Sequence, residues 1–151
     1  MNPAMQPKGV EDPYYTAFRG TFTSLLSWKN LDDFWDVLRG RANAGWYIYA
    51  IGEPAPTAIS KSDEVVRFVT EIGALLRRDH REDYCAIVYT DSKTEPTFIK
   101  IFDPNNLGVS CGYSDNPPLP GWVMSLLPPR ELKDNQTLAE GRRRWWQKLW
   151  A

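Results

Sequence analysis

Apolar side chains recur at helical spacing between residues 60 and 80. The stripe consists of large aliphatic and aromatic residues three or four positions apart, at Val65, Phe68, Val69, Ile72, Leu75 and Leu76. Such a stripe occupies one face of an α-helix, and the charged residues between its members lie on the other face. Each large apolar side chain contributes about 1.5–3 kcal/mol when it is buried. The pattern therefore predicts a helix from Ser60 or Ser62 to about His80 that packs on a core.

A shorter helical pattern precedes this one, at Leu31, Phe34, Trp35 and Leu38. Asn30 is a suitable N-cap for that helix, because its side chain can accept a hydrogen bond from a free backbone N–H. Asp32 and Asp33 would lie in the first turn, where negative charge is favourable. Gly40 or Gly45 is expected to end the helix, because glycine accepts the left-handed geometry of a helix terminus.

Short runs of β-branched and aromatic residues predict strands. The run Trp46–Ile51 lies between two glycines and is typical of a buried strand. Four further candidates follow at close spacing, at Tyr84–Thr90, Thr97–Phe102, Val109–Tyr113 and Trp122–Leu127. Their short, turn-forming connections favour antiparallel pairing, because a parallel pair needs a crossover of about a dozen residues or more. We expect these four strands to form a meander, and the strand near Ile48 to join the same sheet.

Strands that cluster after the helices, rather than alternate with them, indicate an α+β fold. We expect an antiparallel sheet of four or five strands, two helices packed mainly on one face, and a C-terminal amphipathic helix. This single domain would occupy residues 16–129, behind a flexible N-terminal arm at residues 1–15 that contains three prolines and has no periodicity. Residues 18–28 mix strand-forming and helix-forming side chains. Residues 130–151 would form a polar linker and the C-terminal helix.

The C-terminal helix is the most unusual segment. Thr137 and Glu140 are spaced as a capping box, which predicts a helix from Leu138 to Trp150. Residues 137–151 carry four basic groups and one acidic group, a charge of +3, whereas the other residues carry 14 basic and 18 acidic groups, a charge of −4. The candidate binding residues are Arg142, Arg143, Arg144, Trp145, Trp146, Leu149 and Trp150. Isolated helices shorter than about 12–15 residues are marginal in water, so something must order this one.

Three arrangements would order the C-terminal helix. It could pack on its own acidic domain and complete the core. It could dock in a groove of a protein partner, where Trp and Arg are favoured anchors. It could also lie on an anionic membrane surface, with its tryptophans at the interface. Our leading hypothesis is a non-catalytic interaction or accessory protein that docks on a protein partner through this helix and the adjoining sheet surface.

A small enzyme is the alternative, with His80 as general acid or base. His80 is the only histidine, and Asp79, Asp83 or Cys111 would assist it. A non-catalytic protein is favoured, because Gly-rich phosphate loops, paired-histidine metal motifs and nucleophile elbows are absent from the sequence. Two cysteines and one histidine do not form a zinc-site spacing, so neither a metal nor a cofactor is expected. In the expected meander the Cα atoms of Cys85 and Cys111 would lie about 9–10 Å apart, too far for a disulfide.

Composition narrows the class of protein further. Of the 151 residues 42% are hydrophobic, which excludes a chain that is disordered throughout. The net charge of −1 argues against a nucleic-acid-binding surface. The longest apolar run is far shorter than the roughly 20 residues that span a bilayer, and no secretory signal pattern is present. We expect a cytoplasmic protein with reduced thiols.

Overall fold

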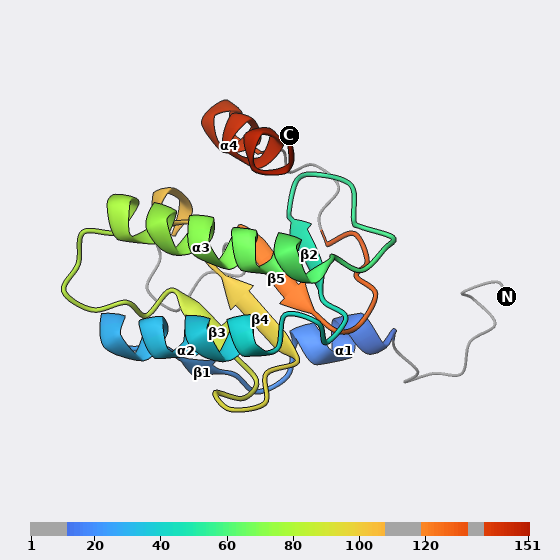
Figure 1. Ribbon diagram of the computed structural model, residues 1–151, viewed down its shortest axis with the longest axis horizontal. Coiled ribbons are helices and arrows are strands. Elements are labelled where there is room, and N and C mark those ends of the chain that lie inside the picture. The colour runs from blue at the N-terminus through green and yellow to red at the C-terminus, as the bar shows by residue number, and fades with distance from the viewer. Residues whose placement is uncertain (1–11, 108–118, 133–137) are drawn as a thin grey trace, which may run out of the picture.

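The computed structural model describes residues 12–107, 119–132 and 138–151. Its elements in chain order are α1 (Pro13–Phe18), β1 (Thr23–Ser24), α2 (Trp28–Gly40), β2 (Tyr47–Ala50), α3 (Ser62–Asp79), β3 (Val88–Thr90), β4 (Phe98–Ile101), the 3-10 helix η2 (Pro104–Asn106), β5 (Trp122–Ser125) and α4 (Glu140–Trp150). The fold is α+β, with α2 and α3 side by side on one face of an antiparallel sheet (Figure 1). This confirms the predicted fold class, including the C-terminal helix.

The five strands of the sheet are ordered β1-β3-β4-β5-β2, and every neighbouring pair is antiparallel. The strand around Ile48 joins the sheet at one edge, where Ile48 is opposite Met124 of β5. The meander differs from the predicted one, because β4 pairs directly with β5. The predicted strand Val109–Tyr113 lies outside the described residues, and β5 occupies the place beside β4 that this strand was expected to fill.

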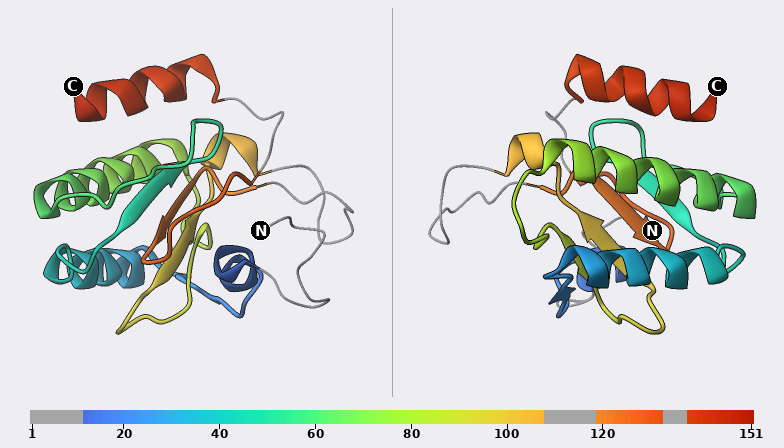
Figure 2. Two further views of the ribbon diagram at one scale, coloured as in Figure 1. Left: turned by 90° about the vertical axis from the view of Figure 1, so that its right-hand side faces the viewer. Right: turned by 60° about the vertical axis from the view of Figure 1, so that its left-hand side comes forward.

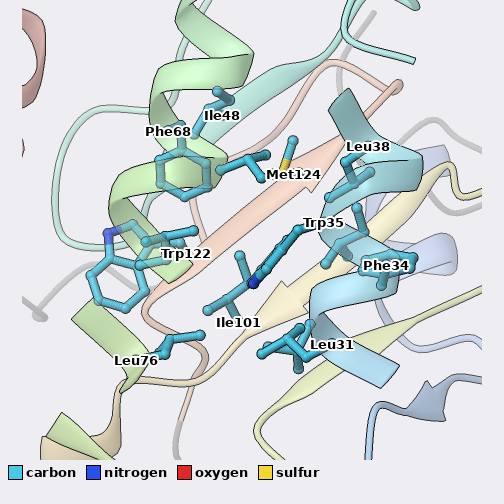
Figure 3. Close-up of a cluster of buried hydrophobic side chains, with 14 of the residues drawn as sticks. Leu31, Phe34, Trp35, Leu38, Ile48, Phe68, Leu76, Ile101, Trp122 and Met124 are labelled. Atoms are coloured by element: carbon cyan, nitrogen blue, oxygen red, sulfur yellow. The ribbon is translucent and has the colours of Figure 1, made fainter. Parts of the chain in front are cut away.

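Helices α2 and α3 bury their apolar stripes against the same face of the sheet (Figure 3). All six predicted positions of α3 are buried. The two helices approach closely at Gly73, where an added Cβ would lie only 3.2 Å from Nε1 of Trp35. Glycine at this position therefore lets the indole of α2 pack directly on the backbone of α3.

The start of α2 differs from the prediction. Ser27, not Asn30, is the N-cap, and its Oγ accepts a hydrogen bond from the Asn30 backbone N–H at 3.0 Å. The side chain of Trp28, the first helical residue, packs against the core and donates from its indole N–H to the Glu82 carbonyl at 2.9 Å. This contact with a distant loop explains why the helix starts before Asn30. The helix ends at Gly40, one of the two predicted ends, but the left-handed geometry on which that prediction rested occurs at Gly45, with a φ of +95°.

Helix α1 covers the other face of the sheet (Figure 2). It begins inside the segment expected to be the flexible arm, and the Asp12 carboxylate caps it by accepting from the Tyr14 backbone N–H at 2.9 Å. Tyr14 is fully buried, and its ring centroid lies 5.2 Å from that of Phe98. Residues 13–15 therefore belong to the folded body.

Helix α4 lies beside α3 at the margin of the molecule (Figures 1 and 2). It begins at Glu140 with Ala139 as its N-cap, so it starts two residues later than the predicted Leu138. Thr137 of the predicted capping box lies outside the described residues. Within the described ranges, no helix has both the length and the apolar character needed to cross a bilayer.

Candidate functional site

The apolar side of α4 packs on its own domain. Leu149 is buried, and Trp145 and Trp146 meet the Phe68 ring of α3 edge-on, with centroids 6.4 and 6.2 Å apart. Trp145 also lies edge-on to Trp122 of β5, at 5.6 Å. Aromatic pairs favour this geometry and separation. Of the three arrangements considered for this helix, the described contacts supply the first, since the domain itself orders the helix.

Arg142 holds the N-terminal part of α4 to the domain through ion pairs. Its guanidinium donates two hydrogen bonds to the Asp103 carboxylate, at 2.8 and 2.9 Å, and lies 2.9 Å from the Asp79 carboxylate. The Arg142 side chain is only 11% exposed. Hydrogen bonds from Arg78 and from Arg142 hold the pKa of Asp79 below its usual value. This predicted binding residue is therefore used inside the protein.

The outer side of α4 carries exposed basic residues. Arg143, Arg144 and Lys148 are all exposed. Arg144 pairs with Glu140 one turn earlier on the helix, at 3.2 Å. Within the described parts of the chain, Arg143 and Lys148 have no carboxylate partner. These two cations are free to interact with an external group.

A groove of about 480 Å³ runs between α3 and α4. The walls include Trp145 and Leu149 from α4. The charged side chains that line the groove are three basic ones, Arg67, Arg78 and Lys148, and one acidic one, Glu71. From the sequence, the arginines of α3 can be assigned to its polar face, but not to a particular neighbour. Their position beside α4 depends on how the two helices pack, and helical periodicity does not contain that information.

The residues considered for catalysis have structural partners. His80 is 8% exposed and ends α3 as its C-cap. Its Nε2 lies 2.9 Å from the Cys85 carbonyl oxygen, which can only accept, so the imidazole N–H donates. The rings of Trp28 and Tyr84 pack against the imidazole at 5.9 and 6.4 Å. The histidine thus fastens the loop that follows α3 to the body of the domain.

No described side-chain contact joins His80 to Asp79 or Asp83, and its hydrogen bond to Cys85 is to the backbone carbonyl, not to the thiol. Asp79 interacts with arginines, and Asp83 is exposed in the loop after α3. Cys85 is fully buried, and burial raises the pKa of its thiol, which opposes formation of a nucleophilic thiolate. Cys111, and with it the predicted Cys85–Cys111 separation, lies outside the described residues. In the described part of the chain, His, Cys, Asp and Glu side chains form no group of three or more that could hold a metal ion.

One notable side chain, Lys100, was not identified from the sequence. It lies on β4 between Ile99 and Ile101, and its Nζ lies over the rings of Phe18 and Phe22. A charged residue within the apolar run of a predicted central strand is the signal that could have drawn attention to it. Its surroundings come from α1 and the segment after it, where no element had been predicted.

Comparison of the chain with protein-family models, with curated proteins and with solved structures finds no match. Residue roles are therefore argued from geometry and chemistry alone. The two features that invite a functional explanation are the basic surface of α3 and α4 and the aromatic surroundings of Lys100.

Proposed function

We propose that this protein is a non-catalytic accessory protein that binds an acidic segment of a protein partner on the outer side of α4 and the adjoining side of α3. The observation that carries the proposal is the pair of exposed, unpartnered cations Arg143 and Lys148 on α4, of which Lys148 also lines the basic groove. The sequence predicts that a sheet surface beside the C-terminal helix takes part in docking. Because α4 packs beside α3, the surface of α3 takes its place in the proposal.

Charge complementarity supports an acidic partner. On α4 three exposed basic side chains, Arg143, Arg144 and Lys148, accompany one exposed acidic side chain, Glu140, whereas residues 1–136 carry a net charge of −4, so an acidic segment is attracted to α4 and repelled by the rest of the chain. Such complementarity directs encounter and orientation more than it adds affinity. Exposed charges are screened by salt over about 8–10 Å, so the interaction should weaken as salt concentration rises.

The aromatic residues of α4 support a protein partner over a simple anion. Trp146 and Trp150 are half-buried, and their rings meet edge-on at 5.3 Å. Each ring therefore packs on the domain and still offers part of its surface at the helix boundary. Exposed aromatic surface beside arginine is typical of the residues that dominate binding energy at protein interfaces.

The contacts of α4 and His80 count against the two alternatives. Insertion of α4 into a membrane surface would use the apolar stripe that holds Trp145 and Leu149 against the domain. Acid–base catalysis by His80 would require its imidazole to reach a ligand, but the ring is only 8% exposed and packs against Trp28 and Tyr84.

The experiment measures binding of a fluorescein-labelled peptide that alternates glutamate with leucine and phenylalanine, by fluorescence anisotropy with the full chain. Arg143→Glu and Lys148→Glu should each weaken binding by about tenfold, because each removes an attraction and adds a repulsion, both worth up to about 1 kcal/mol, and a tenfold change needs about 1.4 kcal/mol. Lys93→Glu is the matched control, since it makes the same charge change at an exposed position in the β3–β4 loop.

The controls decide between a defined surface and general attraction. A peptide with glutamine in place of glutamate should bind much more weakly to the unaltered chain. Equal weakening by Lys93→Glu, or undiminished binding by both α4 variants, would refute the proposed surface.

A further inference from the structure

A second cavity lies on the opposite face of the sheet from α2 and α3. Its volume is about 330 Å³, and its walls include Phe22, Ala86, Tyr89, Lys100, Phe102 and Leu107. Lys100 is opposite Tyr89 on β3 and Val123 on β5, so these three side chains share a face. Val123 packs with Tyr14 of α1, which identifies the face as the one that α1 covers. The cavity lies beside α1 on that face.

Lys100 brings a cation into these apolar surroundings. Its Nζ lies 4.1 Å from the centroid of the Phe18 ring and 4.2 Å from that of Phe22. In the described part of the chain, Lys100 has neither a carboxylate partner nor a side-chain hydrogen bond. Burial alone lowers the pKa of the amine to about 8. Aromatic faces compensate only part of the lost hydration, so the ammonium retains the capacity to bind an anion.

We propose that this cavity binds a small aromatic carboxylate, whose carboxylate pairs with Lys100 Nζ and whose ring packs against Tyr89 and Phe102. The volume falls in the range of about 300–1,000 Å³ that is usual for small-molecule sites. A mostly apolar wall with one placed charged group also matches that class of site. Tyr89 and Phe102 already meet edge-on at 5.6 Å, and a further ring can join them in the same geometry.

The chemistry of the wall excludes two simpler ligands. A neutral apolar molecule would remove water from the Lys100 ammonium without replacing its hydrogen bonds, which costs free energy. Inorganic phosphate would find one cation and an apolar wall, and its other oxygens would lose hydration without a partner. A monovalent carboxylate on an aromatic ring satisfies both parts of the cavity, because a charge-assisted hydrogen bond is about twice as strong as a neutral one.

The test compares three probes by isothermal titration calorimetry on the full chain: benzoate, benzyl alcohol and inorganic phosphate. Benzoate should bind at least about tenfold more tightly than the other two. Lys100→Met keeps a long side chain over the phenylalanine rings and removes the charge, so it should lose at least about tenfold in benzoate affinity. Lys93→Met, an exposed lysine in a loop, should leave benzoate binding unchanged.

The location of binding is tested in the same protein by amide chemical shifts. Benzoate should shift the amides of β3 and β4 and leave those of α4 in place. Absence of saturable benzoate binding, equal binding of benzyl alcohol, undiminished binding to Lys100→Met, or shifts centred elsewhere would overturn the proposal.

The pH dependence supplies an independent readout. Benzoate affinity should fall as pH rises through about 8, because Lys100 then loses the proton that pairs with the carboxylate. Tyr89 is the other titratable side chain in the named wall, so Tyr89→Phe is the control variant. The same pH dependence in Tyr89→Phe assigns the titration to Lys100, and its disappearance there would refute that assignment.

Discussion

Removal of the Arg142 guanidinium tests what holds α4 on the domain. The side chain joins three elements, because it starts on α4 and bonds Asp103 before η2 and Asp79 at the end of α3. All three side chains are largely shielded from water, at 11% exposure for Arg142, 14% for Asp103 and 19% for Asp79. The charges therefore interact with less screening than an exposed pair.

The expected cost of Arg142→Ala is about 2–3 kcal/mol. Hydrogen bonds to charged groups contribute about 1.5–3 kcal/mol each when a partner is left unsatisfied. Asp103 loses both of its guanidinium bonds, whereas Asp79 keeps the hydrogen bond from Arg78 at 2.9 Å. This loss of unfolding free energy should be smaller than the roughly 3–5 kcal/mol that breaking a fully buried ion pair costs, because water can reach Asp103 once α4 loosens. Arg143→Ala, on the next residue but exposed, should cost less than about 0.5 kcal/mol.

Urea denaturation gives the free energy of unfolding, and hydrogen exchange shows whether α4 detaches before the rest unfolds. A double-mutant cycle of Arg142→Ala with Asp103→Asn should show a coupling of about 1–2 kcal/mol. The folded-state pKa of Asp79 is lowered, so its contribution is present above the unfolded-state pKa and is lost as the pH falls through the folded-state value. The difference between the unaltered chain and Arg142→Ala should therefore shrink in acid. An Arg142→Ala cost no larger than that of Arg143→Ala would refute the reasoning.

Three further predictions concern the interior. Gly73→Ala should lower the free energy of unfolding in urea by about 1 kcal/mol, because the added Cβ meets the buried Trp35 ring at 3.2 Å and overpacking outweighs the helix propensity of alanine. Ala86→Gly should raise it in the same assay by about 0.5–1 kcal/mol, because Ala86 has a φ of +57°, which glycine adopts without strain. In a Cys111→Ser background, the Cys85 thiol should react with a chromogenic disulfide reagent only when denaturant unfolds the chain, because it is fully buried and its pKa is raised.

The element that could be predicted best from sequence is α3. Its six apolar positions repeat at helical spacing over about three turns, so local periodicity alone identifies both the helix and its buried face. The strand at Tyr47–Ala50 was equally accessible, because it is a continuous apolar run between two glycines. In both cases the information lies within one segment.

Features that depend on distant partners could not be predicted. The sequence predicts that Thr97–Phe102 pairs with the next candidate strand, Val109–Tyr113, because consecutive strands usually pair. In the structure β4 pairs with β5, and the sequence pattern does not indicate this. Helix α1 has only six residues, too few for a periodic signal, and Tyr14 stabilises it by packing on Phe98. Ser27 and Asn30 are both competent N-caps, and the contact of Trp28 with a loop 54 residues away favours the earlier start.

The same distinction applies to the proposed binding surface. The sequence shows that one side of the C-terminal helix must be covered, but burial of Trp145 and Leu149 stabilises the helix equally well against the domain or against a partner. In the structure the domain covers that side, so docking by α4 can use only its outer side and the groove next to α3. Deleting the helix would therefore expose core side chains such as Phe68 and change stability and binding together. Charge reversal at Arg143 or Lys148 leaves the inner contacts intact, and for that reason it can separate the two roles of the helix.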